Sequence, residues 1–314
     1  MLKAQHLVRQ YGSVTAVNNV SFEIDQQQIV GLLGHNGAGK TTIMKMMTGF
    51  LEPGSGSISI DGVDVNQYTA ATQARVGYLP ENCPLYLDMT VIDFLLYVTQ
   101  LRHMPYRSAR RAVQQTLVRT DIGSKACQKI QTLSRGYRQR VGVAQAILSE
   151  PSILILDEPT NGLDPSQVEN MRSLIKQLAQ TTTVIISTHV LQEVSAVCDR
   201  VLILKQGELA LDSTLENLQQ GDQLLITVDR PPEQLIAQLQ DHVVVQTIEY
   251  LGQDQTGYSY RLSPAGSNTL VSIVPEITRT LVQCGYNVTR ITPERRDLES
   301  IFREINLPSH VALQ

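Results

Sequence analysis

The chain has 314 residues and a formal net charge of -4; 42% of its residues are hydrophobic and 18% are charged. This length allows two domains of ordinary size with a substantial core, and the acidic balance excludes a protein that binds polyanions over its whole surface. The four cysteines form no short Cys-x-x-Cys pair, so neither a disulfide framework nor a zinc cluster is expected, and a reducing compartment fits this usage.

Membrane and secretion signals are not recognisable in the sequence. The start, MLKAQHLVRQYGSV, contains no apolar run of the kind that a signal peptide needs. The most apolar stretches, TVIDFLLYV and ILIL, are far shorter than the roughly 18 residues of a membrane-spanning helix. We therefore expect a cytoplasmic chain that lies on the inner face of a membrane only through a partner.

Up to about Gly221, short β-type runs alternate with helical runs. SVTAVNNVSFEID and GSISIDGVDV predict antiparallel strands, and RVLILKQGELAL predicts a hairpin around Gly207. The runs QIVGLLG, SILILDEP and TTVIISTH predict buried strands, each followed by a helix. Buried strands that alternate with helices predict an α/β fold with a parallel sheet covered on both faces.

Between these strands, residues from about 90 to 150 predict a helical subdomain. Its part from Phe94 to Ser149 contains ten Lys or Arg residues and a single acid, Asp121. Two interpretations stay open for this charge. It is either a solvated basic face, or a surface that meets nucleotide phosphates or acidic loops of a partner.

The polar stretch DSTLENLQQGDQ predicts a connection to a second domain, so we expect domains at residues 1–221 and 222–314. From Asp222 onward the chain has no lysine, seven arginines and eleven acidic residues. Its runs predict the order βαββαβ, including a helix at PPEQLIAQLQ and a further final helix at RRDLESIFREIN. This order indicates a small ferredoxin-like α+β domain.

A phosphate-binding loop is predicted at GHNGAGKT, which fits G-x-x-x-x-G-K-[ST] between a predicted strand and a helix. Its glycines let backbone N–H groups surround a phosphate. Lys40 is expected to reach the β- and γ-phosphates, Thr41 to bind Mg²⁺ and Thr42 to touch the α-phosphate side. The predicted nucleotide-binding residues here are Gly34, His35, Asn36, Gly37, Ala38, Gly39, Lys40, Thr41 and Thr42.

Two further segments carry groups suited to phosphate chemistry. ILILDEPT delivers Asp157 and Glu158 at the carboxyl end of a buried strand, where Asp157 would hold Mg²⁺ and Glu158 would act as general base. LSRGYRQR opens a helix at Ser134 with three arginines and no acid. The unpaired N–H groups of such a helix start favour an anion.

Together, GHNGAGKTT, LSRGYRQR, ILILDEPTNGLDP and IISTH resemble the motif series of the ATP-binding subunits of ABC transporters, over roughly the first 220 residues. GYLPENCPLYLDMTV and the tail are similar to the subgroup that serves multidrug, polysaccharide and gliding-motility exporters. The resemblance implies a P-loop NTPase core with an antiparallel β subdomain and a helical subdomain, and an ATPase that uses ATP and Mg²⁺.

The resemblance also implies a head-to-tail dimer, expected to pair two identical chains. Ser134 and the N–H of Gly136 would then bind the γ-phosphate of ATP held by Lys40 of the other chain. The sequence departs from the family's common signature, since Arg135 and Tyr137 stand where glycine and glutamine are usual. Arg135 either adds attraction to the phosphates or is solvated, and Tyr137 cannot make the amide contacts of glutamine.

Further positions match the family. His189 would contact the γ-phosphate and help to orient water, Tyr11 would stack on adenine, and the residues NGLD would connect the two sites of the dimer. Glu81 stands where glutamine usually touches Mg²⁺ and couples to the transmembrane subunit. A carboxylate can still bind Mg²⁺, so we expect hydrolysis with an altered Mg²⁺ dependence.

The function implied is that of the ATPase that powers an ABC exporter through closure and opening of the dimer, with a transmembrane permease as partner. The apolar stretch DMTVIDFLLYV is a candidate docking surface, although core packing is the alternative for most of it. Two other functions stay open: an ABC-type ATPase that acts on nucleic acid or ribosomes, and a nucleotide-dependent regulator. Because the chain has one phosphate-loop motif, no extended heptads and no cysteine cluster, we expect no nucleic-acid partner.

Overall fold

The computed structural model describes residues 1–231, 245–265 and 270–306, and these divide into two compact units. The first comprises residues 1–215 with the chain end from Ile305, and the second comprises Glu216–Glu304. The boundary falls inside DSTLENLQQGDQ, where the sequence predicts a polar connection. The stretch is ordered: it forms the end of β10, the helix α8 (Leu215–Gln219) and the start of β11 (Gln220–Val228).

An antiparallel sheet opens the first unit, in the strand order β2-β1-β4-β5. Its strands are β1 (Leu2–Tyr11), β2 (Val14–Ile24), β4 (Ser55–Ile60) and β5 (Val63–Asp64). The sequence analysis made no strand prediction for β1, the middle strand of this sheet. Leu2, Ala4 and Leu7 of β1 are each no more than 1% exposed, so this strand is held in place by its buried side chains.

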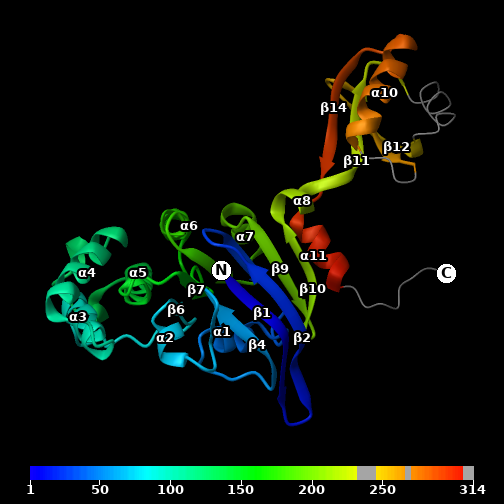
Figure 1. The fold of residues 1–314 in the computed structure, drawn as a ribbon. Coiled ribbons are helices and arrows are strands. Elements are labelled where there is room, and N and C mark those ends of the chain that lie inside the picture. Colours follow the sequence, from blue (N-terminus) through cyan, green and yellow to red (C-terminus); the bar gives the residue numbers. More distant parts are fainter. Residues whose placement is uncertain (232–244, 266–269, 307–314) are drawn as a thin grey trace. The chain divides into compact units, whose positions relative to one another are not determined.

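The second sheet has the order β10-β9-β3-β8-β7-β6 and is parallel except for β10, which pairs antiparallel with β9 (Figure 1). Its strands are β3 (Ile29–Leu33), β6 (Val76–Leu79), β7 (Ile153–Asp157), β8 (Thr183–Ser187), β9 (Arg200–Lys205) and β10 (Glu208–Thr214). All five residues of β3, β7 and β8 are buried, as the continuous apolar runs predict.

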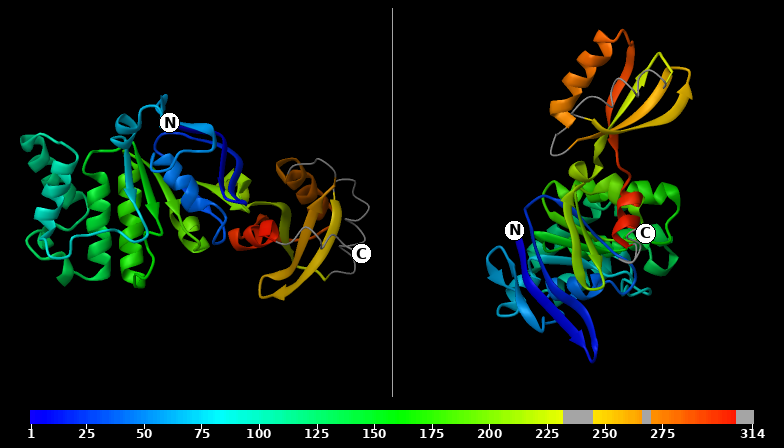
Figure 2. Two further views of the ribbon diagram at one scale, coloured as in Figure 1. Left: turned by 90° about the horizontal axis from the view of Figure 1, so that it is seen from below. Right: turned by 90° about the vertical axis from the view of Figure 1, so that its right-hand side faces the viewer.

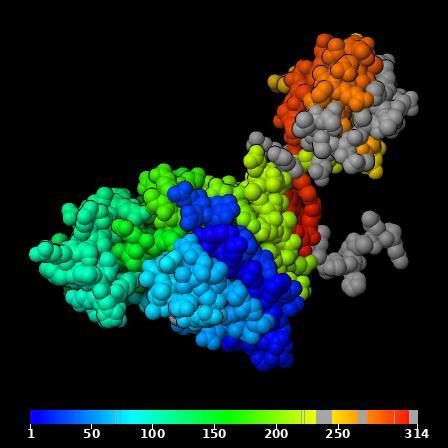
Figure 3. Space-filling model, in the orientation of Figure 1, coloured from blue at the N-terminus to red at the C-terminus, as the bar shows by residue number. Residues whose placement is uncertain are grey.

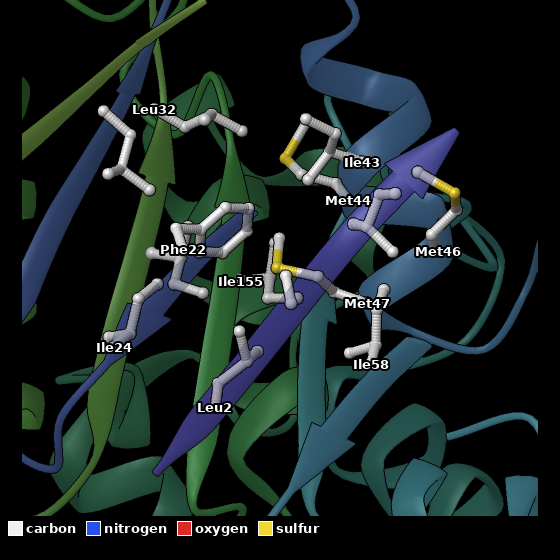
Figure 4. Packing of buried hydrophobic residues seen from close by; sticks show 14 of the residues in the cluster. Leu2, Phe22, Ile24, Leu32, Ile43, Met44, Met46, Met47, Ile58 and Ile155 are labelled. Atoms are coloured by element: carbon white, nitrogen blue, oxygen red, sulfur yellow. The ribbon is translucent and has the colours of Figure 1, made fainter. Parts of the chain in front are cut away.

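Helices cover both faces of this sheet. Helix α1 (Lys40–Met47) packs with Leu32 of β3 against the antiparallel sheet, and Figure 4 shows the shared core of leucine, isoleucine and methionine side chains. On the other face, a Cβ at Gly31 would come within 3.0 Å of Val194 in α7 (Leu191–Val197). Helix α6 (Pro165–Ala179) packs on β8, and the short α2 (Thr69–Gln73) precedes β6.

The predicted helical segment lies at one end of the first unit (Figure 3), and it has a core of its own. It contains α3 (Val91–Leu101), α4 (Tyr106–Arg119) and α5 (Arg135–Ile147). Thr90 caps α3 and Ser134 caps α5 through their side-chain oxygens. Most of the apolar residues of DMTVIDFLLYV lie in or against this core, among them Val91, Phe94 and Leu95, so this stretch chiefly serves packing.

The second unit is a four-stranded antiparallel sheet in the order β12-β13-β11-β14, with α10 (Leu270–Gln283) along one face (Figure 2). The remaining elements are β12 (Val245–Asp254), β13 (Gly257–Pro264), β14 (Val288–Arg295) and α11 (Leu298–Asn306), the last two residues of which belong to the first unit. Because β13 lies between β11 and β12, this is the split arrangement that the sequence predicts. The helix predicted at PPEQLIAQLQ lies outside the described residues.

Among the described residues, no helix is long and apolar enough to span a membrane. The four cysteines are free.

Candidate nucleotide site

Four neighbouring strands of the parallel sheet bring the predicted catalytic residues to one edge. The phosphate loop follows β3, His189 follows β8, Asp157 and Glu158 end β7, and Glu81 follows β6. Because these strands run parallel in the order β3-β8-β7-β6, their carboxyl ends lie side by side. A crevice at the carboxyl ends of parallel strands is where α/β sheets bind their ligands.

The phosphate loop, Gly34–Thr41, requires glycine because its backbone passes close to neighbouring strands. Gly39 has φ +104°, and a Cβ there would lie 2.5 Å from the carbonyl oxygen of Ala16 in β2. Helix α1 then begins at Lys40 without a side-chain cap and without an acid in its first turn. Its first N–H groups are therefore free for an anion. His35, Asn36, Gly37 and Thr41 are exposed, Thr42 is half-buried, and Gly34, Ala38 and Gly39 are buried.

Lys40 is 8% exposed, and its ammonium folds back onto the phosphate loop. Nζ donates to the carbonyl oxygen of Gly34 at 2.6 Å and to that of His35 at 3.2 Å. Burial lowers the pKa of this lysine, while the carboxylates of Glu158 and Asp157 act in the opposite direction. The cation is thus already placed in the loop before any phosphate arrives.

Asp157 is 7% exposed at the end of β7, and burial raises its pKa. The hydroxyl of Ser187 and the ammonium of Lys40 lower this pKa, and the charges of Glu158 and Glu81 raise it further. A buried carboxylate that is costly to ionise gains from a bound cation. Glu81 is exposed, and its Oε1 accepts a hydrogen bond from Asn161 Nδ2 at 3.2 Å.

Glu158 and His189 form a hydrogen-bonded pair, with Oε1 of the glutamate 2.8 Å from Nδ1 of the histidine. The other oxygen, Oε2, accepts from the hydroxyl of Thr188 at 3.2 Å. Glu158 has φ +48°, a left-handed conformation that is costly for a non-glycine residue and gathers at functional sites. Its own N–H donates to the carbonyl of Ser187 at 2.8 Å, which holds this turn.

Thr188 was missed by the sequence reasoning. The sequence did contain a signal for it. Thr188 directly precedes His189 in STH, so it must also lie at the carboxyl end of β8, close to the catalytic residues.

Ser134 and Gly136 are not brought to this edge. Ser134 Oγ accepts from the N–H of Tyr137 at 3.4 Å at the start of α5. A polar cavity of about 160 Å³ opens there, and none of its lining residues belongs to the phosphate loop. The cavity is lined by Asp121, Ser134, Gly136, Tyr137, Arg140, Leu163, Gln167, Asn170 and Met171.

Tyr11 lies at the end of β1, 48% exposed, with the guanidinium of Arg9 5.2 Å from its ring centre. It pairs with Val14 in the hairpin that leads into β2. Strand β2 also presents the carbonyl of Ala16 to Gly39, so this hairpin and the phosphate loop are neighbours.

Comparison with known proteins agrees with this geometry. The ABC transporter family profile matches residues 17–161. An uncharacterized ABC transporter ATP-binding protein of Bacillus subtilis, YdbJ, is 33% identical over 308 residues, which cover 96% of this chain and 94% of YdbJ. The bacitracin transport ATP-binding protein BcrA of Enterococcus faecalis is 30% identical over 97% of this chain and 96% of BcrA.

Among solved structures, CbiO1 of Clostridium perfringens, part of the ABC transporter complex CbiONQ, is similar with a TM-score of 0.64 and 28% identity, over 68% of this chain and 88% of CbiO1. The sheet order, the glycine loop before α1 and the near full-length relatives lead to one assignment. The chain belongs to the ATP-binding proteins of ABC transporters, the ATP-hydrolysing subunits that power transport.

Proposed function

We propose that this chain is the ATPase of an ABC exporter and acts as a head-to-tail homodimer on the cytoplasmic face of a membrane, beneath a transmembrane permease. Residues 1–221 are the ATP-binding domain and residues 222–314 an accessory domain. One observation carries the proposal: the two groups of phosphate-binding residues lie in different places in one chain, at the phosphate loop and at the start of α5. A second copy must therefore complete each site.

The phosphate-loop half binds ATP through its N–H groups and through Lys40. The ammonium of Lys40 exchanges the carbonyls of Gly34 and His35 for phosphate oxygens, which are stronger acceptors because they are charged. Tyr11 stacks on the adenine, since its ring is exposed beside the loop.

Mg²⁺ fits the oxygen groups that converge at the edge of the sheet. Asp157, Thr41 and Glu81 supply the carboxylate and hydroxyl ligands that this ion prefers. When bound, it neutralises charge on the phosphates. Asp157 is the principal ligand, because its carboxylate is buried and a bound cation would offset the burial that raises its pKa.

Glu158 is placed to accept a proton from the attacking water. Its side chain is only 12% exposed, and its carboxylate is held from two sides, by Thr188 and His189. His189 is 61% exposed, so its other ring nitrogen remains available to the γ-phosphate. A base fixed in this way can act without reorganisation at the moment of reaction.

The permease is proposed to dock beside α1 and β6. A cavity of about 340 Å³ lies there, lined by Lys45, Thr48, Phe50, Gln73, Val76, Tyr78, Pro80 and Arg102. Phe50, one of these lining residues, is 78% exposed, with the ammonium of Lys45 5.9 Å from its ring centre. Because Tyr78 and Pro80 lead directly to Glu81, a cytoplasmic segment of the permease seated here would sense the nucleotide site.

The test uses the variant Glu158→Gln, which should bind ATP without hydrolysing it. On size-exclusion chromatography with ATP and Mg²⁺ it should elute as a dimer, and addition of Ser134→Ala should weaken that dimer. Monomers at all ATP concentrations would refute the dimer. Isolation of the chain from cells with ribosomes, rather than with a multi-spanning membrane protein, would refute the role in export and favour the nucleic-acid alternative.

A further inference from the structure

Arg135 is an unpaired cation at the start of α5. It is the first residue of the helix, directly after the cap residue Ser134, and its side chain is exposed. Within the part of the chain that the structure describes, Arg135 makes no hydrogen bond and no ion pair. Its guanidinium instead rests on the backbone of Gly162, where an added Cβ would lie 2.4 Å from the arginine Cζ.

Gly162 belongs to the loop NGLD and has φ +71°. The following residue, Leu163, lines the polar cavity together with Ser134 and Gly136. Arg135 is therefore displayed on the same surface as the two residues proposed to meet the ATP of a second chain. A short rotation of its side chain away from Gly162 would free the guanidinium for a ligand at that surface.

The phosphate-loop half of the site has the opposite charge imbalance, an excess of carboxylates over cations. The carboxylates of Glu158 and Asp157 act on the ammonium of Lys40, and the charges of Glu158 and Glu81 both raise the pKa of Asp157. ATP adds further negative charge. Glu81 and Arg135 therefore carry opposite charges on the two surfaces that would meet.

We propose that Arg135 is a second cation of the ATP site, supplied in trans. In the head-to-tail dimer proposed above, on which this inference rests, its guanidinium donates to γ-phosphate oxygens of ATP held by the other chain and offsets the charge of Glu81. Arginine suits this role because it is always charged and its planar fork can donate two parallel hydrogen bonds to phosphate. The dipole at the start of α5 acts in the same direction.

The decisive experiment compares two heterodimers that contain the same two substitutions in different chains. In the first, one chain has Lys40→Ala and the other has Arg135→Gln; in the second, one chain has both and the other is wild type. Two affinity tags separate heterodimers from homodimers, and phosphate release gives kcat and KM for ATP.

If Arg135 acts in trans, only the first heterodimer keeps a complete site, formed by the intact phosphate loop of the Arg135→Gln chain and the arginine of the other chain. Its kcat/KM should exceed that of the second heterodimer about 10- to 100-fold, as expected for a charge-assisted contact. The reverse order, with the second heterodimer more active, would show that Arg135 acts within its own chain. Equal activities would show no role in the site, and either result overturns the proposal.

The proposal that Arg135 offsets the negative charge of Glu81 is tested in homodimers. Arg135→Gln should lose more kcat/KM in the wild-type background than in Glu81→Gln, and Arg135→Lys should recover part of the loss. Arg107→Gln, which removes an exposed arginine of α4, is the matched control and should change neither constant. An equal loss in both backgrounds would refute the offset. Failure of Glu158→Gln to dimerise with ATP would instead refute the dimer itself, and with it any role in trans.

Discussion

Replacing Glu158 by glutamine removes a proton acceptor while leaving the shape of the side chain almost unchanged. The amide can still contact Thr188 and His189, which lie 3.2 and 2.8 Å from the two carboxylate oxygens. Because the left-handed backbone at Glu158 is held by its N–H bond to Ser187, the turn should persist. The loss is then that of a general base, about 10²- to 10⁴-fold in kcat, or about 3–5 kcal/mol in the barrier.

The contact between Glu158 and His189 leads to a sharper prediction. When two residues act as a unit, the effects of replacing them on the activity of the enzyme are not additive. His189→Ala should lower kcat about 10- to 100-fold, and the double variant should be no slower than Glu158→Gln alone. Phosphate release under saturating ATP, together with KM, measures all three variants. Losses that multiply in the double variant would refute the idea that the histidine acts through the glutamate, and a wild-type rate in Glu158→Gln would show that this residue is not the base.

Three further predictions concern the remaining parts of the site. Gly39→Ala should abolish ATP binding in a nucleotide titration and cost about 1–3 kcal/mol in thermal unfolding, because its Cβ would meet the carbonyl of Ala16 at 2.5 Å; wild-type binding would contradict this. Tyr11→Ala should raise KM for ATP about 10- to 100-fold, the equivalent of about 1–3 kcal/mol of base stacking, with kcat unchanged; a fall in kcat alone would argue against stacking. Asp157 must be ionised to hold Mg²⁺, so kcat/KM should fall as the pH drops through its pKa, and because that pKa is raised the fall should begin above the usual carboxyl range. Glu81→Gln removes one cause of the raised pKa, so its acidic limb should lie at lower pH and its Mg²⁺ titration should change; superimposable profiles would refute this coupling.

Much of the fold was predictable because local patterns and long-range packing agree. The apolar runs before Gly34, Asp157 and Thr188 form buried parallel strands, as their continuous hydrophobicity indicates. Where the two disagree, prediction was absent. The strand β1 was overlooked because its mixed polar and apolar residues show their burial only when β2 and β4 pair on both sides.

The sequence by itself determined which chemical groups are present and their local backbone: a glycine-rich loop, a lysine at a helix start, and carboxylates at the end of a strand. These depend on residues a few positions apart, so spacing along the chain is sufficient to identify them. Tertiary structure alone decided that His189 contacts Glu158, that Asn161 contacts Glu81, and that Arg135 rests on Gly162 rather than on an acidic residue. Those contacts join segments far apart in the chain, and their geometry follows from the order of strands in the sheet, which residue spacing does not contain.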